Sequence, residues 1–181
     1  MSGRGTDRPD EVIEHGPVTL HRYRAGDAGA VFDAVTESLA QLRPWLPWAA
    51  GYRRESAEEY VADSIRHWDD GTEFNYAITT GGTMAGSIGL MARIGPGGLE
   101  MGYWMRTAYT RRGLATAAAA ALVEQAFRLP GVHRVEIVHD ELNGASGAIP
   151  RKLGFTEVER RPLDMPVTAG TGVGVVWRLV R

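Results

Sequence analysis

The chain contains the segment LEMGYWMRTAYTRRGLAT at residues 99–116, in which a strand pattern passes through a polar turn into a helix. Between Leu99 and Met105, apolar side chains occupy every second position, which is typical of a strand with one buried face. The stretch 113–128 is dominated by alanine, the strongest helix former. Free N–H groups and the helix dipole at the start of such a helix favour a bound phosphate. The segment therefore predicts an anion site within an α/β fold.

The turn itself supports this interpretation without proving it. Gly113 allows a ligand to approach the backbone closely, and Arg111 and Arg112 add positive charge. The turn lacks the Gly-Lys-Ser/Thr ending of a nucleotide-triphosphate loop and the Gly-x-Gly-x-x-Gly pattern of a dinucleotide site. A polar turn with two surface arginines is the alternative, so this segment alone leaves ligand binding open.

Working outward from this segment, apolar periodicity and Gly/Pro punctuation divide the rest of the chain into elements. A Ser-x-x-Glu capping box at Ser56 and Glu59 predicts the start of the second helix, which should end near Gly71. We expect strands at 18–23, 74–79, 83–94, 99–106, 132–139, 155–161 and 173–180, and helices at 28–42, 56–71, 113–128 and 145–153. This order, with about seven strands and about four helices, predicts an α/β sandwich with a mixed sheet and not a doubly wound fold of strictly alternating units.

Composition sets limits on the class of protein. The 181 residues are 44% hydrophobic and 23% charged, with a formal net charge of −2, so no overall basic field favours nucleic acid or an anionic membrane. We expect a disordered tail at 1–14 and a single domain at 15–181. The absence of cysteine excludes disulfides and thiolate catalysis. No apolar run reaches the roughly 20 residues of a membrane span, and no secretory signal is evident, which predicts a cytoplasmic protein.

A second segment, NGASGAIPRKLGF at 143–155, has the pattern of a short capped helix. Asn143 and Ser146 suit its start and Gly154 its end. Pro150 lies within this helix and has no N–H, so the carbonyl of Ser146 loses its helical partner. Just before it, the run at 139–141 (His-Asp-Glu) cannot direct three consecutive side chains at one ion from a regular strand, so no metal is predicted.

Together the two segments resemble the GNAT family of acetyltransferases. Its phosphate motif, Gln/Arg-x-x-Gly-x-Gly/Ala, falls on 110–115, and its Asn-x-x-Ser…Leu-Gly-Phe pattern falls on 143–155. The runs EMGYW at 100–104 and LRPWLPW at 42–48 resemble the RimJ/RimL-type branch, which acetylates N-termini of ribosomal proteins. The sequence departs from the family at Thr110, where Gln or Arg is usual. It also departs at Pro150, where other branches have a tyrosine that protonates the leaving thiolate.

The resemblance implies the α/β GNAT fold, with a mixed, mostly antiparallel sheet of about seven strands flanked by about four helices. It also implies that acetyl-CoA is the co-substrate and that an amine attacks its thioester directly. It implies a pyrophosphate site at the backbone of Arg111, Arg112, Gly113, Leu114, Ala115 and Thr116. Pantetheine would pair with the strand at Tyr103, Trp104 and Met105, and a backbone N–H near Trp104 or Met105 would stabilise the oxyanion. Ser146 would hydrogen-bond or protonate the leaving thiolate, and Asn143 would contact the pantetheine or the adjoining backbone.

The acceptor side is less specific. Glu100 is the first candidate base, with Glu136 and Asp164 as alternatives; each could also be a solvated or salt-bridged carboxylate. Trp45, Trp48 and Glu100 are candidates for acceptor binding, and for both tryptophans core packing is an equal alternative. For Trp68, core packing is the favoured expectation.

The resulting hypothesis is an N-acetyltransferase acting on a protein or peptide α-amine, as a monomer or homodimer. A small-molecule N-acetyltransferase for an amino acid, a polyamine or an antibiotic amine is the runner-up. A non-catalytic acyl-CoA sensor is the third alternative. An acyl group somewhat larger than acetyl is not excluded by any residue.

Overall fold

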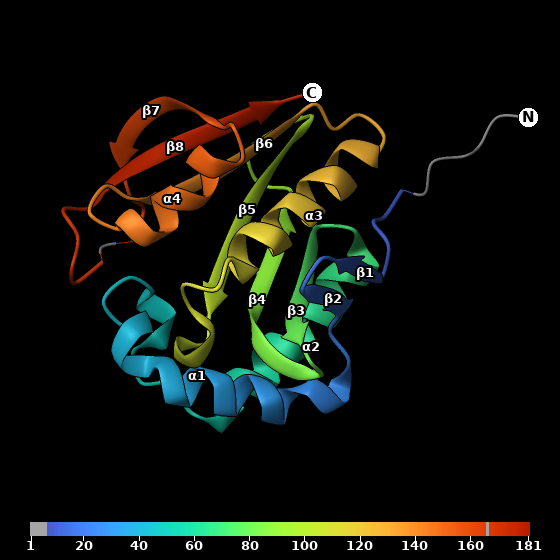
Figure 1. Ribbon diagram of the computed structural model, residues 1–181, viewed down its shortest axis with the longest axis vertical. Helices are drawn as coiled ribbons and strands as arrows, with labels where there is room; N and C mark the ends of the chain where they lie inside the picture. Colours follow the sequence, from blue (N-terminus) through green and yellow to red (C-terminus); the bar gives the residue numbers. More distant parts are fainter. Residues whose placement is uncertain (1–6, 166) are drawn as a thin grey trace, which may run out of the picture.

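An eight-stranded sheet runs through the centre of the protein, in the order β1-β2-β3-β4-β5-β6-β8-β7 (Figure 1). The computed structural model describes residues 7–165 and 167–181. Neighbouring strands pair antiparallel, except β5 and β6, which are parallel. The strands are β1 Val12–His15, β2 Val18–Arg22, β3 Glu73–Thr80, β4 Thr83–Met91, β5 Gly98–Met105, β6 Arg134–Asp140, β7 Thr156–Pro162 and β8 Val173–Val180.

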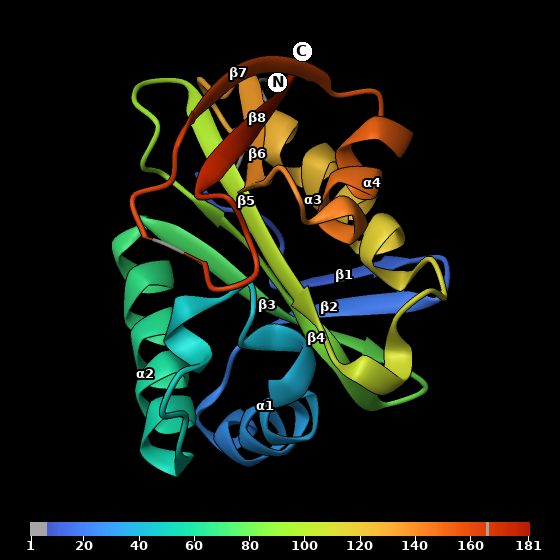
Figure 2. The same cartoon turned by 90° about the vertical axis from the view of Figure 1, so that its left-hand side faces the viewer.

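Four α-helices cover the two faces of this sheet. They are α1 Ala28–Leu42, α2 Arg54–Asp70, α3 Leu114–Arg128 and α4 Gly144–Lys152. Figure 2 shows α3 and α4 on one side of the sheet and α1 and α2 on the other. The larger core cluster joins the alanine-rich α3 to the sheet, and a second cluster lies under α1 and α2. The predicted mixed, mostly antiparallel α/β fold is confirmed.

The eighth strand, β1, falls within the stretch 1–14 that the sequence predicts to be a tail. It pairs with β2 from Val12↔His21 to His15↔Val18, and Gly16 makes the reversal with φ +55°. For residues 12–14 the expectation of a tail is therefore wrong. Residues 1–6 lie outside the described residues. A strand of four residues is too short for its periodicity to be seen in the sequence.

Helix α2 begins earlier than the sequence predicts. Its first residue is Arg54, so Ser56 occupies the third helical position and is not the N-cap. The Ser56 hydroxyl instead accepts a hydrogen bond from the backbone N–H of Arg53 at 3.4 Å. The predicted end is confirmed, because Gly71 closes the helix with φ +73°.

A bulge in β4 changes which face its side chains occupy. Thr79 pairs with Met84, yet Ile78 pairs with Gly86, so Ala85 is an extra residue in β4. Met84 consequently packs in the cluster under α1 and α2, whereas Ile88 and Leu90 pack under α3. The period-two spacing of Met84, Ile88 and Leu90 in the sequence would put them on one face of the strand, but the bulge places Met84 on the other face.

Strands β5 and β6 pair only over their first halves. The pairing runs from Gly98↔Arg134 to Met101↔Ile137 and then stops. Beyond it, β5 continues to Met105 against β4, and β6 continues to Asp140 against β8. The two strands thus diverge, and no strand of the described residues occupies the edge of the second half of β5 (Figures 1 and 2).

Candidate active site

The free edge of β5 between Gly102 and Met105 presents backbone groups toward the gap that opens between β5 and β6. Arg106 donates its N–H to Ala85 of β4 at 2.8 Å. Because N–H groups alternate between the two edges of a strand, those of Tyr103 and Met105 point away from β4. Of the two positions expected to stabilise an oxyanion, Met105 therefore faces the gap, whereas the Trp104 N–H faces β4.

Helix α1 fixes the end of β5. The Glu37 carboxylate accepts two hydrogen bonds from Arg106, at 2.7 and 2.6 Å, and Gln41 Nε2 donates to the Met105 carbonyl at 3.4 Å. Ser38 Oγ accepts the backbone N–H of Thr107 at 2.9 Å. The sequence analysis missed these residues. A usable signal was Ser38, a polar side chain on the apolar face of the predicted helix and fully buried in the structure.

The turn between β5 and α3 leaves a run of backbone donors free. Among the described residues, none of the six N–H groups from Arg111 to Thr116 makes a hydrogen bond of normal geometry to a protein acceptor, and the next bond is Ala117 N–H to Gly113 O at 3.0 Å. Arg111 has φ +60° and Gly113 has φ +74°, which turns the chain into α3. Consecutive free donors at a helix N-terminus form an anion-binding arrangement.

The side chains of this turn add charge and stiffness. The Arg112 guanidinium lies over the Tyr109 ring at 5.2 Å, and Arg111 is exposed. Thr110, which replaces the Gln or Arg of the family motif, donates its hydroxyl to the Thr107 carbonyl at 2.9 Å. Thr110 therefore closes the preceding turn, and the two arginines are the cations nearest to the free N–H groups in sequence.

Helix α4 has both predicted caps. Asn143 Oδ1 accepts the N–H of Ser146 at 3.2 Å, so this side chain contacts the adjoining backbone. At the other end Gly154 has φ +79°, and Phe155 N–H reaches the Pro150 carbonyl at 3.0 Å, as in a Schellman motif. Both caps hold Ser146 at the start of a short, well-defined helix.

Tyr103 connects the open edge of β5 to Ser146. Its hydroxyl donates to the Ser146 carbonyl at 2.9 Å, and Ser146 Oγ lies 3.4 Å from the same hydroxyl, within donating distance. Burial raises the pKa of Tyr103 to about 12, so the phenol keeps its proton at neutral pH. The structure thus brings together two residues, Tyr103 and Ser146, that the sequence analysis assigned to co-substrate binding and thiolate stabilisation.

The candidate bases lie on the opposite face of the sheet from α3. Glu100 and Glu136 are neighbours across the β5–β6 pairing. Glu100 forms an ion pair with Arg93, and this hydrogen bond raises the pKa of the Arg93 guanidinium. Glu136 is buried and accepts a hydrogen bond from Arg178 Nε–H at 2.7 Å. It also forms an ion pair with Arg134, whose Nε lies 3.6 Å away.

Glu100 precedes Tyr103 by three residues, or about 10 Å along a strand. The carboxylate of Glu100 would therefore reach an amine at the gap only through intervening water. The third candidate, Asp164, is exposed between β7 and β8.

Aromatic side chains border the same face. Trp48 is 45% exposed, and its ring lies 6.2 Å from that of Trp104 and 6.0 Å from that of Tyr52. Trp45 is half-buried in the turn after α1. Trp68 is a core residue as expected, 2% exposed and packed edge-on against Phe74.

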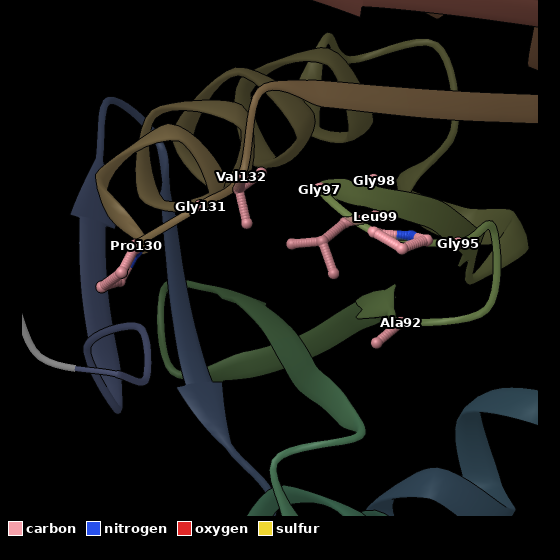
Figure 3. A pocket seen from close by; sticks show the side chains of 9 residues that line it. Ala92, Gly95, Gly97, Gly98, Leu99, Pro130, Gly131 and Val132 are labelled. Atoms are coloured by element: carbon pink, nitrogen blue, oxygen red, sulfur yellow. The ribbon is translucent and has the colours of Figure 1, made fainter.

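The hollow shown in Figure 3 lies elsewhere. It is formed at the first residues of β5, at the opposite end of that strand from Met105. The residues that line it are all glycine, proline or aliphatic, namely Ala92, Gly95, Pro96, Gly97, Gly98, Leu99, Pro130, Gly131 and Val132. Such a lining offers no side-chain acid, base or cation for acyl transfer.

The run at 139–141 is engaged in structural hydrogen bonds. His139 Nε2 accepts Trp177 Nε1–H at 2.9 Å, and Asp140 accepts the N–H of Gly172 at 2.9 Å. Within the described part of the chain, no group of three His, Asp or Glu side chains is arranged to hold a metal ion. Over the same residues, no helix has both the length and the apolar character needed to cross a bilayer.

A mixed sheet with diverging β5 and β6, and a donor-rich helix start beside the gap, defines an acyltransferase of the GNAT fold. A family model described as "Acetyltransferase (GNAT) domain" matches residues 18–156. This match covers well over half of the chain, and the chain therefore belongs to the GNAT acetyltransferase family.

Three proteins illustrate what the chain is similar to. It is 27% identical over 153 residues to "Putative ribosomal N-acetyltransferase YdaF" of Bacillus subtilis (strain 168), covering 81% of each chain. Its fold matches RimL, a ribosomal L7/L12 alpha-N-protein acetyltransferase in complex with coenzyme A, with a TM-score of 0.87 and 21% identity. The match covers 94% of this chain and 98% of the RimL chain. It also matches the microcin C7 self-immunity acetyltransferase MccE in complex with acetyl-CoA and AMP, with a TM-score of 0.84 and 15% identity. This match covers 91% of this chain and 93% of the MccE chain.

Proposed function

We propose that this protein transfers an acetyl group from acetyl-CoA to the N-terminal α-amine of a protein or peptide. The observation that carries the proposal is the run of six free backbone N–H groups at Arg111–Thr116, which lies at the head of α3 beside the unpaired edge of β5. A diphosphate linked to an extended amide chain fits both features at once. The coenzyme A bound to RimL and the acetyl-CoA bound to MccE support the same ligand.

Binding would use the backbone more than the side chains. The pyrophosphate oxygens would accept the free N–H groups at the start of α3, with Arg111 and Arg112 neutralising charge. The pantetheine amides would pair with the free edge of β5 at Tyr103 and Met105, filling the place of a missing strand. This pairing would bring the thioester to the gap beside Ser146.

The transfer would be a direct displacement at the thioester carbonyl. The neutral amine forms a C–N bond, the tetrahedral oxyanion is stabilised by a backbone N–H such as that of Met105, and the C–S bond then breaks. Ser146 Oγ would hydrogen-bond or protonate the departing thiolate, whose conjugate acid has a pKa of about 8.5. The proton lost by the amine would pass through water to Glu100, the proposed base nearest in sequence to Tyr103.

An α-amine suits this site better than a lysine side chain. Its pKa of about 8 leaves a useful neutral fraction at pH 7, whereas that of lysine is about 10.4. The proposed acceptor surface includes Trp48 beside Trp104, and the exposed ring of Trp48 could contact a peptide end. The similarity to a ribosomal N-acetyltransferase supports a ribosomal protein as acceptor and the cytoplasm as the place of action.

Calorimetry with acetyl-CoA tests the phosphate site directly. We expect the unmodified protein to bind acetyl-CoA with micromolar affinity, and we expect Gly113→Asp, which puts a carboxylate among the free donors, to abolish this binding. Gly131→Asp is the matched control, because Gly131 also has a positive φ and open space around it but lies beyond the other end of α3. Retained binding in Gly113→Asp, or no binding by the unmodified protein, would contradict the proposed site.

Thiol release with a panel of acceptors then tests the reaction. Peptides that differ only in a free or blocked N-terminus should separate α-amine transfer from lysine transfer. Turnover with amino acids, polyamines or antibiotic amines, but not with peptides, would assign the acceptor to the small-molecule class. Binding of acetyl-CoA without turnover of any amine would indicate a sensor.

A further inference from the structure

The first turn of α4 contains a carbonyl that its own helix cannot satisfy. In an α-helix the carbonyl of Ser146 would accept the N–H of residue 150. That residue is Pro150, which has no N–H, and it is buried within the helix. A partly buried carbonyl without a donor costs free energy, so a partner from outside the helix stabilises it.

Tyr103 supplies that partner from β5, 43 residues away in the chain. Its hydroxyl donates to the Ser146 carbonyl at 2.9 Å. Since this bond uses the phenol proton, the same oxygen is left to accept, and Ser146 Oγ lies 3.4 Å from it. Tyr103 thus contacts both the backbone and the side chain of Ser146.

The backbone of Ser146 is therefore held at two points. Asn143 fixes its N–H at 3.2 Å and Tyr103 fixes its carbonyl. The Asn143 bond lies within the α4 segment and can move with it. The Tyr103 bond joins the start of α4 directly to β5.

We infer that Tyr103 is a positioning residue, whose hydroxyl holds Ser146 in register with the open edge of β5, and that Pro150 makes α4 dependent on it. The inference rests on the proposed acetyl transfer, because it concerns the placement of the hydroxyl group assigned to the leaving thiolate. It gives Pro150 a defined role. Because Pro150 has no N–H, the Ser146 carbonyl takes its hydrogen bond from β5, the strand that would pair with the pantetheine, and not from its own helix.

A double-mutant cycle tests this dependence. Tyr103→Phe removes only the hydroxyl, and Pro150→Ala returns an N–H to the position that faces the Ser146 carbonyl. Turnover, the KM for acetyl-CoA and amide hydrogen exchange of segment 143–153 are measured for the four proteins. In the Pro150 background, Tyr103→Phe should lower kcat about ten- to a hundredfold, leave KM within about twofold and speed exchange in the segment.

In the Pro150→Ala background the same Tyr103→Phe change should lower kcat less than about threefold, because the helix now satisfies the carbonyl itself. Rescue of this kind is not expected of a residue that only fills space. Equal losses of kcat in both backgrounds, or unchanged exchange in Tyr103→Phe, would overturn the positioning role. If none of the four proteins releases thiol, the proposed transfer and the role of Tyr103 in it are overturned. Amide hydrogen exchange that is faster in Tyr103→Phe, and restored by Pro150→Ala, would still establish that Tyr103 stabilises the start of α4.

Discussion

At the scale of single residues, Ser146 carries the most direct chemical prediction. Ser146→Ala removes Oγ but keeps the N–H that Asn143 accepts and the carbonyl that Tyr103 contacts, so α4 should fold normally. We expect kcat to fall about ten- to a hundredfold, with acetyl-CoA affinity and thermal stability nearly unchanged. Ser56→Ala, at the start of α2, is the control. A fall in affinity that matches the fall in kcat would show that Ser146 binds and does not assist the leaving group.

Glu100 carries a second residue-scale prediction, which depends on pH. Glu100→Gln should lower kcat/KM for a peptide about tenfold or more at pH 7 and much less at pH 9. The loss shrinks because an α-amine with a pKa of about 8 is mostly neutral at pH 9 and needs no base. Arg93→Gln, which leaves Glu100 in place but removes its ion-pair partner, is the matched variant. An equal loss at both pH values would indicate that Glu100 has a structural role.

At the scale of elements, the packing of α4 on β6 allows no side chain at Gly147. A Cβ built there would lie 2.7 Å from Nε2 and 2.8 Å from Cε1 of His139, a buried ring that is hydrogen-bonded to Trp177. Gly147→Ala should therefore lower the free energy of unfolding by about 1–3 kcal/mol and shift α4 away from the sheet.

Gly144→Ala is the matched control for that substitution, since its Cβ would meet nothing within 4 Å on the same helix. It should be neutral or slightly stabilising, because alanine is the better helix former. Urea unfolding of both variants, together with turnover of the folded proteins, measures the effect. A neutral Gly147→Ala would show that β6 and α4 are less tightly packed than the structure indicates.

Elements with a strong local signal could be predicted from the sequence. The helix at Ala28–Leu42 and the strand at Val173–Val180 have the predicted bounds, because periodicity and punctuation mark both ends. The extra residue Ala85 and the strand at 12–15 could not be predicted. A bulge and a four-residue strand are determined by the neighbouring strand, which a single stretch of sequence does not reveal.

At the scale of the whole molecule, the candidate site depends on contacts between distant segments. The motif at 110–115 and the caps of α4 are local and could be read from the sequence. The hydrogen bond between Tyr103 and Ser146 joins residues 43 positions apart. The hydrogen bond between Thr107 and Ser38 joins residues 69 positions apart. The sequence did predict that the Ser146 carbonyl would lose its helical partner, but only the fold shows which residue replaces it.

The C-terminal half of the molecule should also be sensitive to acid through His139. Trp177 Nε1 can only donate, so His139 Nε2 accepts and its Nδ1–H donates to the Asp140 carbonyl at 2.7 Å. This arrangement requires a neutral ring. Burial lowers the pKa of His139, with Arg151 acting in the same direction and Asp140 and Glu157 opposing it.

Because the folded-state pKa of His139 is below that of the unfolded chain, its contribution to stability is present above about pH 6.5 and is lost as pH falls through the folded pKa. We expect urea unfolding of the unmodified protein to show a loss between pH 7.5 and pH 5 that is smaller in His139→Gln. That variant can still accept the Trp177 N–H but does not titrate, and the other four histidines are common to both proteins. If the free energy of unfolding falls equally with pH in both proteins, the buried His139 ring accepts a proton without a cost in stability. The hydrogen bond between Trp177 of β8 and His139 of β6 would then not be the contact that acid disrupts.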